Sequence, residues 1–315
     1  MSTLKNIVVL AALVAVLLAG QKAWIYYSAP ATNLSRPAGD PKDSQRQVDR
    51  CVNEANTFTP DQSIDGCTAA VQSGRWSGQD LAAVFLNRGK AFSNEGDLDR
   101  AIADFNEAIR LNPNDATFAA IANYNRGSAY QAKDDLDRAI ADFSEAIRLD
   151  PNFADAYNNR GNAHRAKRNF DLAIADFDAA IRLNAPAPPS LAHGNAGGGN
   201  GRGGASFEGN GAYTYANRGA AYAAKGDIDR AVADFDDAIR LDAKFAGAYF
   251  NRGSAYQVKG DLDRAIADFN EALRLDPKLT AACYRRGKAY ADQGDLDRGL
   301  ADLKACLQRL EEPGQ

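Results

Sequence analysis

Few residues of this 315-residue sequence have the type and spacing that catalysis or metal binding would need. No nucleophile–base pair and no cluster of metal ligands accompanies its two histidines, His164 and His193. The segment Gly199–Gly204 fits the GxGxxG pattern of nucleotide-binding loops, but it follows no strand and opens no tight βα turn. Acidic pairs such as Asp97 and Asp99 recur along the chain, which is typical of helix caps. The sequence therefore predicts a non-enzymatic protein without a metal site or a cofactor.

The cysteines are the other reactive group, and there are four: Cys51, Cys67, Cys283 and Cys306. None forms a CxxC pair, so a zinc site or a thioredoxin-like site is not expected. An even number of cysteines suggests disulfides if the chain is exported. The alternative is four buried thiols.

The N-terminus predicts export. Residues 7–19 form an unbroken apolar run, which is short for a spanning helix and typical of a signal-peptide core. Cleavage could follow Gly20 or Ala31. An aromatic cluster at residues 24–27 suits a bilayer interface instead, so an uncleaved membrane anchor over about residues 6–27 is the second interpretation. Either way we expect residues 1–31 to direct the remainder to the periplasm or to the extracytoplasmic face of the inner membrane.

The composition is that of a soluble folded protein. Apolar residues make up 45% of the chain and charged residues 25%, with a formal net charge of -4. A weakly acidic chain without clustered Lys and Arg is not expected to bind nucleic acid. Abundant alanine favours helix.

An internal repeat organises most of the chain. The tripeptide Asn-Arg-Gly occurs at 87–89, 125–127, 159–161, 217–219 and 251–253, and Arg-Arg-Gly follows at 285–287. The period is 34 residues, with two insertions. A second motif follows the tripeptide at a fixed distance. It is Gly-Asp-Leu-Asp-Arg-Ala-Ile-Ala-Asp-Phe, found at 96–105 and 260–269. A period of this length indicates stacked supersecondary units.

Each unit reads as a pair of short helices. Ala101, Phe105 and Ala108 recur at i, i+4 and i+7, which makes one apolar stripe on a helix. Asp97 can cap that helix after the break at Gly96, and the Asn112-Pro113 pair ends it. Gly89 on the preceding helix would let the two helices approach closely. Arg100 and Asp104, four residues apart, are expected to form an exposed ion pair.

The unit resembles the tetratricopeptide repeat (TPR). That repeat has characteristic residues at positions 4, 8, 11, 20, 24, 27 and 32, and the unit from residue 82 places Phe85, Gly89, Phe92, Phe105 and Pro113 at five of them. Six units match, beginning near 82, 120, 154, 212, 246 and 280. The resemblance implies an all-α, right-handed α-solenoid of helix-turn-helix hairpins. His164 stands at an aromatic position of the third unit.

The domain organisation follows from these units. Residues 45–81 are expected to form a degenerate capping repeat, after a linker at 32–44. Repeats 1–3 would span 82–187 and repeats 4–6 would span 212–315. Residues 188–211, rich in proline and glycine, are expected to form a disordered loop.

The resemblance also implies a cysteine pairing. Aligned to the repeat, Cys51 and Cys67 take positions 8 and 24, and Cys283 and Cys306 take positions 4 and 27. Each pair would face across a hairpin. Disulfides Cys51–Cys67 and Cys283–Cys306 would therefore staple the two ends of the array.

Members of this family usually hold partners in a concave groove lined by first helices. Carried over by position, the groove residues of this chain would be Leu86, Lys90, Tyr124, Ser128, Gln131, Asn158, Asn162, Arg165, Tyr213, Ala216, Phe250, Ser254, Gln257, Tyr284 and Lys288. The family's carboxylate clamp needs Lys at position 5, which is absent here. The recurring Asn-Arg-Gly could contact a peptide too, but we expect it to hold adjacent repeats together.

These observations predict a scaffold in the cell envelope that binds a peptide segment of a partner protein in its concave groove. The alternative is an architectural component that self-associates through the array ends or the convex face.

Overall fold

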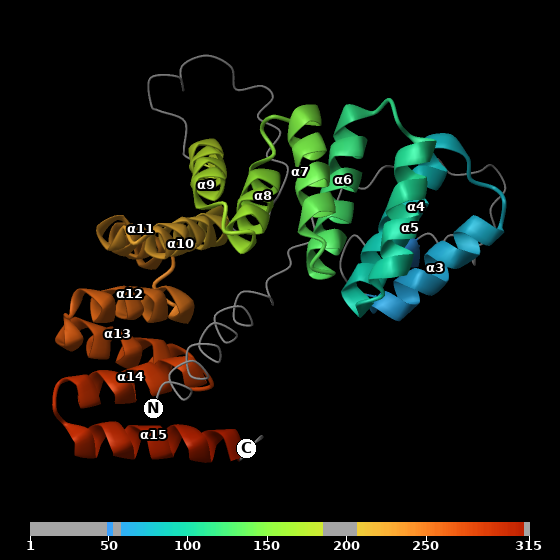
Figure 1. The fold of residues 1–315 in the computed structure, drawn as a ribbon. Helices are drawn as coiled ribbons and strands as arrows, with labels where there is room; N and C mark the ends of the chain where they lie inside the picture. The colour runs from blue at the N-terminus through green and yellow to red at the C-terminus, as the bar shows by residue number, and fades with distance from the viewer. Residues whose placement is uncertain (1–48, 53–57, 185–206, 312–315) are drawn as a thin grey trace, which may run out of the picture. The chain divides into compact units, whose positions relative to one another are not determined.

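The computed structural model describes residues 49–52, 58–184 and 207–311, and every regular element in these ranges is a helix (Figure 1). The predicted signal or anchor at 1–31, the linker at 32–44 and most of the loop at 188–211 lie outside the described residues. Within the described part of the chain, no helix is long and apolar enough to cross a membrane.

The described residues fall into two compact units. The N-terminal unit comprises the helical residues 49–52 and the helices α3 (Pro60–Gln72), α4 (Gly78–Glu95), α5 (Leu98–Leu111), α6 (Ala116–Ala132), α7 (Leu136–Leu149), α8 (Ala154–Ala166) and α9 (Phe170–Asn184). The C-terminal unit comprises α10 (Phe207–Lys225), α11 (Ile228–Leu241), α12 (Ala246–Lys259), α13 (Leu262–Leu275), α14 (Thr280–Asp292) and α15 (Leu296–Glu311).

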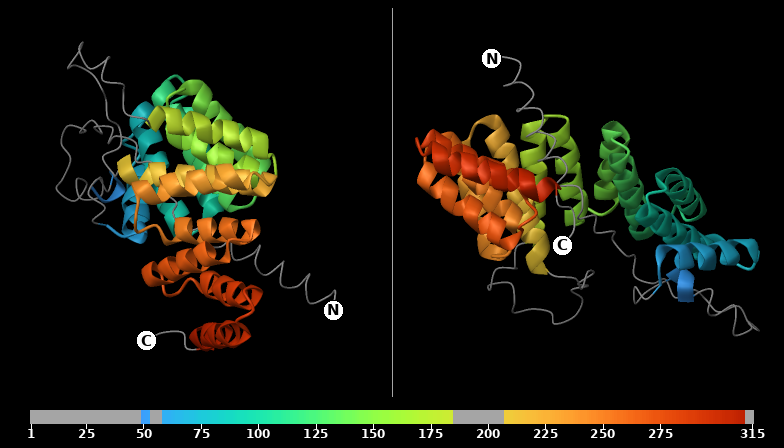
Figure 2. Two further views of the ribbon diagram at one scale, coloured as in Figure 1. Left: turned by 90° about the vertical axis from the view of Figure 1, so that its left-hand side faces the viewer. Right: turned by 90° about the horizontal axis from the view of Figure 1, so that it is seen from below.

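Helices pack as consecutive antiparallel pairs, and within each unit one pair packs on the next, as expected for an α-solenoid (Figures 1 and 2). The six hairpins are α4–α5, α6–α7, α8–α9, α10–α11, α12–α13 and α14–α15. Two helix starts differ from the repeat alignment, because α4 and α6 begin one turn before residues 82 and 120. One boundary was wrong: the last five residues of the predicted loop belong to α10, which begins at Phe207.

A phenylalanine packed against a glycine forms the centre of each of the first five hairpins. Phe105 is fully buried, and a Cβ added to Gly89 would lie 2.7 Å from its ring. Phe143, Phe177, Phe235 and Phe269 are equally buried or nearly so, each against the glycine of its own Asn-Arg-Gly. Interiors this closely packed leave no room for a methyl group. The apolar seam predicted from the sequence is confirmed.

The second helices begin with an aspartate cap, except α9, which follows Asn169. The Asp97 carboxylate accepts a hydrogen bond from the Arg100 amide at 3.1 Å, after Gly96 has ended α4 at φ 85°. The Arg100 side chain turns back to the same carboxylate and lies over the Phe92 ring. Asp135, Asp227 and Asp261 repeat this arrangement. The predicted Arg100–Asp104 pair was therefore wrong, since Arg100 is held by its own cap.

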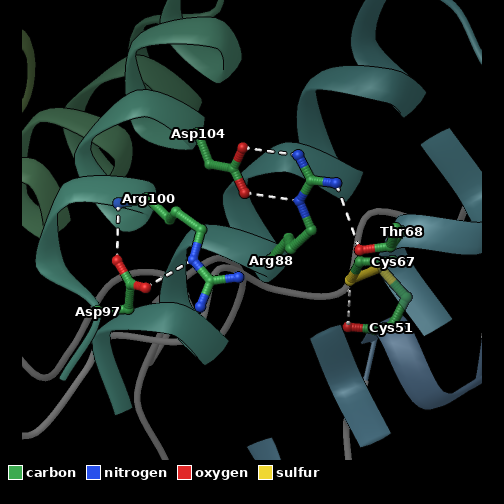
Figure 3. A network of polar contacts seen from close by, with 7 residues as sticks. All are labelled: Cys51, Cys67, Thr68, Arg88, Asp97, Arg100 and Asp104. Atoms are coloured by element: carbon green, nitrogen blue, oxygen red, sulfur yellow. Dashed lines mark hydrogen bonds and ion pairs between the residues drawn. A yellow bond between two sulfur atoms is a disulfide. The ribbon is translucent and has the colours of Figure 1, made fainter. Parts of the chain in front are cut away.

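Asp104 is instead buried and bonded by Arg88 of the Asn-Arg-Gly tripeptide (Figure 3). Two parallel bonds of 2.7 and 2.8 Å join the guanidinium to the carboxylate. We call this pair the Arg–Asp clamp. It occurs in all six hairpins, the others being Arg126–Asp142, Arg160–Asp176, Arg218–Asp234, Arg252–Asp268 and Arg286–Asp302.

The clamp arginine also reaches the preceding hairpin. Its Nη1 donates to Asn106 from Arg126 at 2.6 Å and to Asn270 from Arg286 at 2.7 Å. Arg88 makes the corresponding contact to Thr68 at 3.4 Å (Figure 3). The arginine of Asn-Arg-Gly therefore joins the helices of one hairpin and joins neighbouring hairpins, as the sequence predicted.

The four cysteines pair as expected. Cys51 is bonded to Cys67 on α3, and Cys283 on α14 is bonded to Cys306 on α15. Their Cα atoms lie 4.5 and 5.9 Å apart, within the range that a disulfide spans. No described cysteine is a free thiol. One disulfide lies in the first helices of the N-terminal unit and the other in the last hairpin of the C-terminal unit.

The clamp predicts that removing two different carboxylates of α7 will lower the free energy of unfolding by very different amounts. Asp142→Ala would leave the Arg126 guanidinium desolvated and unpaired, and we expect it to lower the free energy of unfolding by roughly 3 kcal/mol. Glu145→Ala, which removes only an exposed ion pair with Arg148, should cost less than about 0.5 kcal/mol. Urea unfolding monitored by circular dichroism measures both. Equal losses would contradict the role given to the clamp.

The disulfides predict a redox-dependent stability. Replacing Cys51 and Cys67 together by serine should lower the free energy of unfolding of the N-terminal unit by about 3 kcal/mol. Dithiothreitol should lower the stability of the unaltered chain, and in the double variant it should act only through Cys283–Cys306. Peptide mapping without reduction provides the direct check, and four alkylatable thiols in exported protein would refute the pairing.

Candidate partner-binding surface

The first helices of the hairpins carry the residues that differ between repeats. The second helices α5, α7, α11 and α13 have nearly the same sequence, from Leu-Asp-Arg-Ala-Ile-Ala-Asp-Phe onward. Position 12 of the first helix, by contrast, is Ser93, Gln131, Arg165, Ala223, Gln257 and Ala291 in turn. Neighbouring first helices contact one another within each unit. We call α4, α6 and α8 the N-terminal first-helix row, and α10, α12 and α14 the C-terminal one.

Three of the larger side chains predicted for the groove lie inside the repeat core instead. Leu86 is 1% exposed, Tyr124 is 4% exposed and Phe250 is 8% exposed. The next hairpin covers Tyr124: its ring lies 4.9 Å from that of Phe153, and its hydroxyl accepts a bond from the Asn159 amide. The prediction that these three residues line the groove was therefore wrong, because their side chains are not accessible to a peptide. The small Ala216 is buried in the same way.

Two predicted serines have partners within their own helices. The Ser128 hydroxyl donates to the Tyr124 carbonyl at 3.0 Å, and the Ser254 hydroxyl donates to the Phe250 carbonyl at 2.9 Å. Ser128 is buried as well. The structure therefore assigns both hydroxyls to the backbone of the first helices.

In the C-terminal row the polar side chains bond to one another. Gln257 donates to Asp292 at 3.4 Å and accepts from Arg285 at the same distance. Lys288 pairs with Asp292 at 3.3 Å. Lys288 is exposed, and so are the two tyrosines, Tyr213 at 40%, tilted against the Phe245 ring, and Tyr284 at 36%.

In the N-terminal row two cations, Lys90 and Arg165, lack such partners among the described residues. Lys90 on α4 is half-buried, and no carboxylate of the described residues lies within ion-pair distance of it. Burial alone lowers its pKa to about 8. Burial likewise lowers the pKa of Arg165 on α8, whose one contact among the described residues is a 3.5 Å approach to Asn162. Asn158 lies on the same helix and is half-buried.

One residue of this surface was missed by the sequence interpretation. Ser93 takes position 12 of α4, the same position as Gln131 on α6 and Arg165 on α8. It is 6% exposed, and its hydroxyl has no partner among the described residues. Aligning position 12 across the repeats would have placed it with the other two.

His164 lies on α8, at a repeat position that is aromatic in the other hairpins. Burial lowers the pKa of its imidazole, which favours the neutral form, and its Nδ1 is buried without a partner. No group of three or more metal-ligating side chains is present in the ranges that the structure describes. His193 lies outside those ranges.

Lys90 predicts a measurable effect on stability. Its pKa is lower in the folded chain than the roughly 10.4 of an unfolded chain, so the folded state carries a desolvated charge below about pH 8. Stability should rise with pH between about 8 and 10, where the unfolded chain binds the extra proton. Lys90→Met should therefore stabilise the protein by on the order of 1–2 kcal/mol near pH 7, with a smaller gain near pH 10.

Urea unfolding at the two pH values measures this gain, and Lys288→Met is the control because Lys288 is exposed. A destabilising Lys90→Met, or a gain that does not change with pH, would show that Lys90 is not desolvated.

Comparison with known proteins agrees with this architecture. Models of the tetratricopeptide repeat match residues 82–115, 154–185, 246–279 and 280–309, and a further TPR model matches 127–167 and 219–260. A search of curated protein sequences gave no significant match.

Among solved structures, a TPR protein from Parabacteroides merdae is similar over 85% of this chain and 93% of its own, at 16% identity and a TM-score of 0.62. PilW, a type IV pilus biogenesis factor, is similar over 75% of this chain and 96% of its own, at 18% identity and a TM-score of 0.59. These similarities concern the fold. With repeat matches over more than half of its length, the chain belongs to the tetratricopeptide repeat family.

Proposed function

We propose that this protein is an exported, non-catalytic scaffold that binds a peptide segment of a partner protein along its first helices. Repeats of this family serve protein–protein interaction, and the chain consists largely of them. The observation that carries the proposal is the contrast within each hairpin. Four of the second helices keep nearly one sequence, which serves packing. The first helices differ from repeat to repeat, for example at the repeat positions of Lys90 and Gln131, and these differences allow them to distinguish partners.

The proposal of export rests on one sequence feature and on the cysteine pairing. The apolar run at 7–19 is typical of an export signal. Both cysteine pairs are placed for disulfides, which persist in oxidising compartments and are rare in the cytosol. We therefore propose the periplasm, or the extracytoplasmic face of the inner membrane, as the site of action.

A second function, self-association, is favoured by the last helix. Leu296 and Leu300 of α15 are 68% and 55% exposed. The equivalent residues of α13, Leu262 and Ile266, are covered because another hairpin follows them. A second copy of the chain could cover the α15 leucines in the same way.

Site-specific photocrosslinking in intact cells tests the proposal. A photoreactive residue at position 131, in the N-terminal first-helix row, should capture a partner protein. The same residue at position 141, on the exposed face of the second helix α7, should capture little. Equal capture at both positions, or none at 131, would contradict binding along the first helices. Dimers of the chain crosslinked from position 300 alone would favour self-association instead.

A further inference from the structure

Three buried polar atoms without hydrogen-bond partners among the described residues occupy the same repeat position in three successive hairpins. They are Ser93 Oγ on α4, Gln131 Oε1 on α6 and Arg165 Nε on α8. All three stand at position 12, and α4 contacts α6 as α6 contacts α8. A buried polar atom without a partner costs about 1–3 kcal/mol, so such atoms are rare unless something bonds them. Ser63, Asn125 and His164 also have such an atom, but only these three share one repeat position, and a ligand could bond them once the side chains that cover them move aside.

The C-terminal unit offers no such row. Its position-12 residues are Ala223, Gln257 and Ala291, and the amide of Gln257 is already bonded to Asp292 and Arg285. The two units share one architecture, and two second helices of each, α5 and α7 and α11 and α13, have nearly the same sequence. The difference therefore arises from the residues of the first helices and not from the fold.

The charges of the N-terminal row point to the chemistry of the ligand. The clamp arginines each hold a carboxylate in two bonds, and Lys133, Lys167 and Lys259 each pair with an aspartate. Lys90 and Arg165 differ from these cations because both are desolvated and neither has a carboxylate among the described residues. Lys90 on α4 and Arg165 on α8, with the polar Gln131 on the helix between them, are complementary to carboxylates of a ligand, whereas the half-buried Asp155 at the start of α8 would repel them.

We infer that the N-terminal first-helix row binds an extended peptide segment bearing acidic side chains. This inference rests on the proposed function and assigns that function to one unit and one class of ligand. Glutamate or aspartate carboxylates of the peptide would take the places opposite Lys90 and Arg165. Ser93 and Gln131 would bond the peptide backbone, as amides and hydroxyls do in extended-peptide sites.

Carboxylates fit these cations better than a phosphate group does. Lys90 and Arg165 lie on different first helices separated by α6, so each can meet one carboxylate of an extended chain. Recognition of a phosphate group usually needs several basic groups in one place. The net charge of -4 also disfavours a polyanion such as nucleic acid.

Selection from a random dodecapeptide library displayed on phage, with the full chain as bait, provides the probe. A selected peptide is then labelled and titrated by fluorescence anisotropy, beside a copy with its acidic residues changed to the corresponding amides. Peptides rich in Glu and Asp are expected, and the amide copy should bind about tenfold more weakly or worse. In the variant carrying Lys90→Gln and Arg165→Gln, both peptides should bind equally weakly.

Matched changes in the C-terminal unit are the controls. Lys288→Gln and Gln257→Ala alter the repeat positions that correspond to Lys90 and Gln131, and they should leave the affinity within about twofold. The amide peptide tests the inference on the unaltered chain, so the result does not depend on the folding of any variant.

The outcomes separate the inference from the proposed function. Selected peptides without acidic residues, or binding lost only in the C-terminal variants, would overturn the inference and leave peptide binding intact. No selected peptide at all would count against the proposed function itself. A photocrosslinker at position 131 that joins the row to the chain's own N-terminal residues, or to a second copy, would also overturn the inference.

Discussion

The structure depends on the close approach of two helices around one buried phenylalanine. In the first hairpin Phe105 occupies the space left by Gly89, and alanines 101 and 108 flank it without exposure. The ring removes a large apolar surface from water, and the missing Cβ of the glycine permits the distance. Because this contact recurs with the same residues in the next four hairpins, and with Leu303 in place of phenylalanine in the sixth, the second helix has little freedom to vary at these positions. Much of the variation between repeats lies in the first helices, for example at position 12.

The Arg–Asp clamp lies next to this contact and explains how a hairpin can bury an aspartate between its two helices. A buried aspartate such as Asp104 would be costly alone, but its two bonds to Arg88 compensate for the lost water. The third arm of the arginine reaches the hairpin before it, as from Arg160 to Ser144 at 3.1 Å. The clamp thus couples the folding of neighbours, which is the property that makes a repeat array cooperative. Against this background of paired charges, Lys90 and Arg165 stand out.

Much of the fold could be predicted from the sequence because the same pattern of residues occurs in several repeats. Six copies of one pattern identify the hairpins, and the alignment of Cys51 with Cys67 across a hairpin needs only the antiparallel geometry. The partner of Asp104 could not be found from spacing within one helix, since Arg100 and Arg88 both lie within reach and only the fold shows that the cap holds Arg100. The start of α10 was missed because glycines 209 and 211 look like loop residues but lie within a helix.

The candidate site was less predictable than the fold. The groove positions of the repeat family indicate on which face of a helix a residue lies. They do not indicate whether the next hairpin covers that residue. Tyr124 is covered by Phe153, which follows it by almost one repeat, and its hydroxyl is used by Asn159. Ser93 is small and gives no signal by itself. Its significance appears only when burial and unsatisfied hydrogen bonding are compared at one position across three hairpins.

The central claim is that the second helices build the array and the first helices of the N-terminal unit bind the partner. A crystal structure of the full chain with a captured partner segment tests this most directly. The account predicts an extended segment along α4, α6 and α8, with carboxylates beside Lys90 and Arg165. A segment bound only to the C-terminal unit, or to the outer faces of α5, α7 and α9, would contradict it.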